Sequence, residues 1–112
     1  NMSRIPPKIE QPSAIKAKVF YVLPVEEDGI TYTVSVVYAE KPKTSEHFLT
    51  ATDAGKNIIW KTSVYYYKYN EALETDVQDI FVVDLYIEGN EVAVKLEYRG
   101  ILRFEKTTGH KI

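Results

Sequence analysis

The sequence predicts an all-β domain, most simply an antiparallel β-sandwich. Apolar and polar residues alternate one by one along most of the chain, which is the pattern of strands that bury one face. Turn signals containing Asp, Asn and Gly separate these segments, and no real helix is expected. Six extended segments result, several of them ten or more residues long. Long strands joined by short turns also suit a small meander barrel of six to eight strands, which is the alternative.

The first hairpin is expected around an Asp-Gly turn at residues 26–29, because Asp-Gly supplies the positive φ of tight turns. Its first strand is Ile15–Leu23, with Leu23 expected inward, and it becomes apolar on both faces toward its end. Its second strand is Thr31–Ala39. The inward residues of this second strand are expected to be Tyr32, Val34, Val36 and Tyr38.

A shorter strand is expected at His47–Ala51, and a longer extended segment follows at 57–69. Alternate residues of the longer segment face opposite ways. The set expected toward the core is Ile58, Trp60, Val64 and Tyr66. The set expected to face away is Ile59, Tyr65, Tyr67 and Tyr69. Residues 70–79 are acidic and predict a loop with at most one helical turn.

The clearest alternation lies between Ile80 and Glu105 and predicts a half-buried hairpin that turns at Gly89-Asn90. Gly100 is expected to mark a bulge or bend within its second strand. One face of this hairpin is expected to hold Phe81, Val83, Leu85, Ile87, Val92, Val94, Leu96 and Tyr98.

At 112 residues the chain corresponds to one domain, large enough to bury one core. Residues 1–13 contain Pro6, Pro7 and Pro12 and predict an extended N-terminal arm. The β domain is expected over 14–106, and a polar tail over 107–112.

The composition excludes several classes of function. Cysteine is absent, so the chain offers no disulfide and no thiolate ligand. A net charge of −2 argues against nucleic acid as a partner. No apolar run approaches the roughly 20 residues of a membrane span. The residues after Met2 lack the apolar stretch of a signal peptide, so a cytoplasmic location is expected if Met2 is the native start, and export if a leader was removed.

No catalytic, metal or cofactor site is predicted. His47 and His110 have no short-range partner spacing, and the serines lack the flanking glycines of a nucleophile elbow. Gly55-Lys56 is followed by Asn57 instead of the Ser or Thr of a phosphate-binding loop. The acidic residues of 70–79 lack the pattern of a defined calcium loop. The chain is therefore expected not to be an enzyme.

Tyrosine is the unusual residue: there are nine, and Tyr65, Tyr67 and Tyr69 alternate along one predicted strand. Alternate strand residues lie roughly 7 Å apart, so the three would form a strip about 13 Å long. A tyrosine ring is rigid and apolar with a polar tip, which suits binding to proteins or stacking on a sugar chain, as in carbohydrate-binding modules. The other interpretation is that these tyrosines only pair with neighbouring strands.

The sequence thus favours a non-catalytic module for protein interaction or homo-oligomeric assembly, using an exposed tyrosine strip. The candidate binding residues are Tyr65, Tyr67, Tyr69 and Trp60. A small-ligand or carbohydrate-binding β domain, acting through a barrel interior or the same tyrosines, is the alternative. An enzyme of unknown class is the third possibility.

Overall fold

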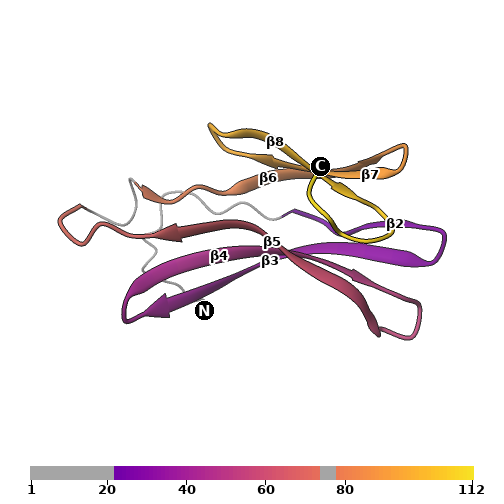
Figure 1. The fold of residues 1–112 in the computed structure, drawn as a ribbon, viewed down its shortest axis with the longest axis horizontal. Coiled ribbons are helices and arrows are strands. Elements are labelled where there is room, and N and C mark those ends of the chain that lie inside the picture. Colours follow the sequence, from indigo (N-terminus) through magenta and orange to yellow (C-terminus); the bar gives the residue numbers. More distant parts are fainter. Residues whose placement is uncertain (1–21, 74–77) are drawn as a thin grey trace, which may run out of the picture.

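The computed structural model describes residues 22–73 and 78–112, which form two antiparallel sheets, drawn one above the other in Figure 1. The larger sheet has the strand order β2 (Val25–Glu27), β3 (Ile30–Glu40), β4 (Lys43–Thr52) and β5 (Ile58–Lys68). The smaller sheet has the order β6 (Val82–Glu88), β7 (Glu91–Leu96) and β8 (Gly100–Glu105). The predicted all-β class is confirmed, and two sheets are compatible with the expected sandwich.

One hydrophobic core lies between the sheets. Because one face of each strand is apolar, stacking the two sheets removes both apolar faces from water, worth about 1.5–3 kcal/mol for each fully buried Val, Leu or Phe. The larger sheet contributes the buried residues Tyr32, Leu49, Ala51 and Val64. The smaller sheet contributes Val82, Leu85, Val92, Val94, Leu96 and Phe104.

The turn between β2 and β3 is shorter than expected. Glu27 pairs with Ile30, so the turn consists of Asp28 and Gly29 alone, with φ of 55° and 79°. Glu26, expected in the turn, lies in β2. Most of the predicted strand Ile15–Leu23 falls outside the described residues; Leu23, expected to point inward, is 79% exposed.

The larger sheet is longer than the smaller one, since β3, β4 and β5 have 10 or 11 residues and β6, β7 and β8 have 6 or 7. The strand expected at His47–Ala51 is part of this longer β4. Val36 pairs with His47 and Tyr38 with Ser45, both on the inner face, yet Val36 and Tyr38 are 38% and 56% exposed. Both side chains therefore lie on the expected face, but neither is buried there.

A β-bulge reverses the alternation in β5. Ser63 pairs with Phe48 but Tyr65 pairs with His47, so Val64 is an extra residue. An extra residue moves every later side chain to the other face. Tyr65, Tyr67 and Tyr69 therefore share the inner face with His47, and Tyr66 points outward at 56% exposure. The predicted inward position of Tyr66 and the outward position of the tyrosine row are both wrong.

The closing segment forms three strands instead of one long hairpin. Residues 97–99 make a second turn, in which Tyr98 has a positive φ of 64°. Gly100 follows with a φ of 84°, and β8 returns beside β7. Gly100 thus begins a new strand, and Tyr98, expected inward, is 83% exposed. A bulge between Val82 and Asp84 also buries Val82 in place of Val83.

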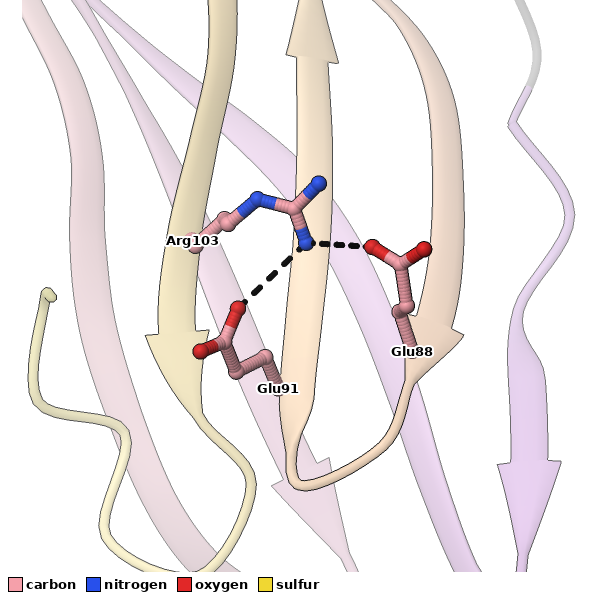
Figure 2. A network of polar contacts seen from close by, with 3 residues as sticks. All are labelled: Glu88, Glu91 and Arg103. Carbon is pink, nitrogen blue, oxygen red and sulfur yellow. Dashed lines mark hydrogen bonds and ion pairs between the residues drawn. The ribbon is translucent and has the colours of Figure 1, made fainter.

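Arg103 ties β8 to the turn between β6 and β7 (Figure 2). Its Nη1 atom lies 2.7 Å from Oε1 of Glu88 and 3.3 Å from Oε1 of Glu91. The bond to Glu88 raises the pKa of the Arg103 guanidinium. The side chains of Arg103, Glu88 and Glu91 are 36%, 65% and 37% exposed, so screening by solvent keeps the contribution of these ion pairs to stability small.

Candidate functional site

The tyrosine row exists as a continuous feature, but on the inner face of the larger sheet, beyond the Val64 bulge. The rings of Tyr65 and Tyr67 are stacked, with centroids 6.3 Å apart and 14° between their planes. The ring of Tyr69 meets Tyr67 edge-on at 5.2 Å. Tyr65 and Tyr67 are half-buried and Tyr69 is only 5% exposed. The row is thus not the exposed strip that the sequence suggested.

Two of the three tyrosine hydroxyls bond to the segment that precedes β6. The Tyr67 hydroxyl donates to Oε1 of Gln78 at 2.9 Å, and the Tyr69 hydroxyl donates to the Asp79 carboxylate. Burial is the main cause that raises the pKa of the Tyr69 hydroxyl, and the hydrogen bond to Asp79 adds to it. The hydroxyl therefore stays protonated and remains a donor. Gln78 in turn accepts from the backbone N–H of Asn70. The row therefore anchors residues 78–79 against the larger sheet.

His47 lies beside the row on β4, with its ring centroid 6.3 Å from that of Tyr65. Its side chain is buried, and Nδ1 has no hydrogen-bond partner among the described residues. Burial lowers the pKa of His47, so the imidazole is neutral at neutral pH. A cavity of about 100 Å³ adjoins it, lined also by Val34, Val36 and Val82. The described part of the chain holds no group of three or more His, Asp or Glu placed to hold a metal ion.

Trp60, the fourth candidate residue, does not join the tyrosine row. It lies near the other end of β5, paired with Ala51, and its ring centroid is 5.9 Å from that of Tyr32 with 42° between the planes. Its indole Nε1–H donates to the carbonyl oxygen of Lys106 at 3.1 Å. Because Lys106 follows β8, this bond connects the two sheets. It involves residues 46 positions apart, so no local pattern in the sequence indicated it.

A cleft of about 290 Å³ opens beside Trp60. Its apolar walls are formed by Trp60 with Ile30, Tyr32 and Ile59. Its polar residues are Glu27, Asp28, Lys106 and Thr107. Lys106 and Glu27 form an ion pair, which raises the pKa of the Lys106 ammonium. The cleft thus combines an aromatic wall with two carboxylates and one ammonium that is already paired.

The outer edge of β3 is a third candidate surface. On that side, β2 pairs only with residues 30–32 of β3, and no strand within 22–73 or 78–112 pairs with residues 33–40. The stretch Thr33–Ala39 contains no charge, no proline and no glycine. Its exposed apolar residues are Val36, Val37 and Tyr38, at 38%, 53% and 56%. The uncharged run was visible in the sequence, and the partner strand expected beside it, Ile15–Leu23, lies almost entirely outside the described residues.

No protein family model matches the chain, and no curated protein matches it with significant similarity. Among the described residues, no helix is both long and apolar enough to cross a bilayer. The function is therefore inferred from the geometry of these three surfaces.

Proposed function

We propose that this protein is a non-catalytic assembly module in which the open edge of β3 pairs with the same edge of a second copy. The observation that supports the proposal is the uncharged stretch Thr33–Ala39, which is exposed from Ser35 to Ala39 and whose outer side pairs with no strand among the described residues. The proposal keeps the assembly role favoured by the sequence and moves the contact surface from the tyrosine row to β3.

An open edge strand presents unpaired N–H and C=O groups that readily accept another strand. Proteins usually protect such an edge with charged residues, proline, a bulge or a very short strand. The edge of β3 has none of these protections over seven successive residues among those described. Its valines, threonine and tyrosine also favour strand pairing. An edge of this composition is well suited to association through strand addition.

The β3 edge is complementary to itself. In an antiparallel pair centred on Val36, Val36 of one copy lies opposite Val36 of the other. The same register brings Ser35 opposite Val37, Val34 opposite Tyr38 and Thr33 opposite Ala39, so the stretch 33–39 pairs without any charged residue. Like charges directly opposite each other would be unfavourable, and this contact contains none. The contact closes around a twofold axis, the commonest symmetry of soluble oligomers.

The tyrosine row is less suited to be the contact surface. Tyr69 is buried, and the hydroxyls of Tyr67 and Tyr69 already bond within the chain. In this proposal the row supports the fold at the end of the larger sheet where β3 is exposed, and the partner contacts β3 itself.

The test is the solution mass, measured by size-exclusion chromatography with light scattering over a concentration series. The wild type should have twice its chain mass of 12.9 kDa. Val37→Lys puts a charge at the centre of the edge and should raise the dissociation constant at least about tenfold, or 1.4 kcal/mol. Tyr66→Lys is the matched control, since Tyr66 is equally exposed but lies on β5, and it should leave the mass unchanged.

A wild type that is monomeric at every concentration would overturn the proposal. So would a Val37→Lys variant that assembles as tightly as the wild type while keeping its circular dichroism spectrum. A chain lacking residues 1–13 should still assemble. Loss of assembly in that variant would assign the contact to the N-terminal residues instead of the β3 edge.

A further inference from the structure

We infer that the cleft beside Trp60 binds a small organic ammonium, that is, a protonated amine on an apolar or aromatic body. The cleft has a volume of about 290 Å³, close to the ~300 Å³ lower limit of typical small-molecule sites. It is formed near the β2–β3 turn by residues of β2, β3 and β5 and by the segment after β8. None of these lining residues belongs to the β3 edge at 33–40, so this site is separate from the proposed assembly surface.

The aromatic wall of the cleft is held rigidly before any ligand arrives. Gly109 packs against the indole of Trp60, and the indole N–H bonds to Lys106. Tyr32, itself 2% exposed, borders the same ring. A wall fixed by these contacts loses little conformational entropy when a ligand binds. Among side chains, the face of a tryptophan attracts an organic cation most strongly.

The charges around the cleft select the sign of the ligand. Glu27 and Asp28 contribute two negative charges and Lys106 one positive charge, which leaves a formal charge of −1 (−2 plus 1). Lys106 forms its ion pair with Glu27 and interacts with Asp28 only at longer range, so the Asp28 carboxylate is the group available to receive an ammonium. An anionic ligand would meet two carboxylates, and a neutral ligand would gain nothing from them. The apolar walls of Ile30 and Ile59 favour a hydrocarbon body over a sugar.

Trp60 is the only tryptophan in the chain, so its fluorescence reports on this cleft alone. The probes are 2-phenylethylamine, 2-phenylethanol and phenylacetate, which share a phenyl body and differ in charge at neutral pH. We expect a saturable change in Trp60 fluorescence with the amine, about tenfold weaker binding of the alcohol, and still weaker binding of the carboxylate. Binding of the amine should weaken with added salt, which screens the carboxylates.

Asp28→Asn is the decisive variant. Asp28 has a φ of 55°, and asparagine tolerates this left-handed conformation as aspartate does, so the turn is retained without its charge. The variant should bind the amine at least about fivefold more weakly, or 1 kcal/mol, and the alcohol as before. Asp84→Asn, an exposed aspartate on β6 outside the cleft, is the matched control and should bind like the wild type.

Three outcomes would overturn the inference: no change of Trp60 fluorescence with the amine, equal binding of all three probes, or an unchanged Asp28→Asn variant. Equal binding of the three probes would identify a purely hydrophobic cleft. The Val37→Lys variant should bind the amine like the wild type. Failure of the assembly proposal and failure of this site can therefore be told apart.

Discussion

Gly109 lies flat against the indole ring of Trp60. A Cβ atom placed on Gly109 would fall 2.6 Å from Cδ2 of the ring, nearer than carbon atoms approach each other. Gly109 belongs to the segment after β8, and Trp60 lies on β5 in the opposite sheet. Figure 1 shows this C-terminal segment, in yellow, curving from the smaller sheet toward β2. Together with the Lys106 contacts to Trp60 and Glu27, this close approach connects the two sheets.

Gly109→Ala should destabilise the protein by roughly 2–4 kcal/mol, since it combines a left-handed backbone at φ 79° with a collision against a packed ring. Gly89→Ala is the matched control, because Gly89 also has a positive φ of 61° but its Cβ would meet no atom within 4 Å. Gly89→Ala should lower the free energy of unfolding by about 1–2 kcal/mol. Urea unfolding followed by circular dichroism measures both. Equal losses would mean that the contact with Trp60 contributes nothing.

Tyr69→Phe should lower the free energy of unfolding by about 1–2 kcal/mol, because the Asp79 carboxylate loses its donor in a partly buried setting. Tyr66→Phe removes a hydroxyl from the neighbouring outward position, where Tyr66 is 56% exposed. Tyr66→Phe should alter the free energy of unfolding by no more than about 0.5 kcal/mol. The same urea measurement compares the two, and a Tyr66→Phe loss as large as that of Tyr69→Phe would contradict the assignment of faces.

The stability of the protein should fall on mild acidification because of His47. Burial lowers its pKa in the folded state, an effect that Asp79 and a hydrogen bond with the Tyr65 backbone only partly oppose. Below the unfolded-state pKa of about 6.5, the unfolded chain binds the proton more readily than the folded chain. The free energy of unfolding is thus unaffected by His47 above that pKa and decreases below it, by at most about 1.4 kcal/mol per pH unit.

Urea midpoints near pH 7.5 and pH 5 measure this effect, because these pH values lie above and below the reference pKa of histidine, about 6.5. His47→Gln should lose less stability between the two pH values than the wild type. His110→Gln should lose as much as the wild type, because the His110 side chain is 80% exposed. A wild type and a His47→Gln variant with the same pH dependence would show that His47 is protonated equally in both states.

Arg103→Gln should lower the unfolding midpoint slightly, by removing the ion pairs to Glu88 and Glu91. The difference from the wild type should shrink as NaCl rises, because the Debye length falls from about 10 Å at 0.1 M to about 3 Å at 1 M. Lys95→Gln, an exposed cation on β7 in the same sheet, is the control. A salt-independent loss at Arg103 would indicate packing of its side chain as the cause.

Strands β3 to β7 and the turns at 28–29 and 89–90 could be predicted from the sequence, because they depend on neighbouring residues. Val92, Val94 and Leu96 point into the core as their alternation indicates, and Asp28-Gly29 and Gly89-Asn90 turn the chain. Strict alternation gives the correct face only as long as a strand contains no extra residue.

Tertiary structure decided what lies beyond each bulge and which distant residues meet. The extra residue Val64 turns Tyr65, Tyr67 and Tyr69 inward, a change that becomes visible only when β5 is aligned with β4. The cleft brings Asp28 to Trp60, and Gly109 reaches the same ring from the opposite sheet. Which strands neighbour β3 within 22–73 and 78–112 is likewise decided by the tertiary structure. These features follow from packing between segments far apart in the chain, whereas the alternation of side chains records only on which face of its own strand a residue lies.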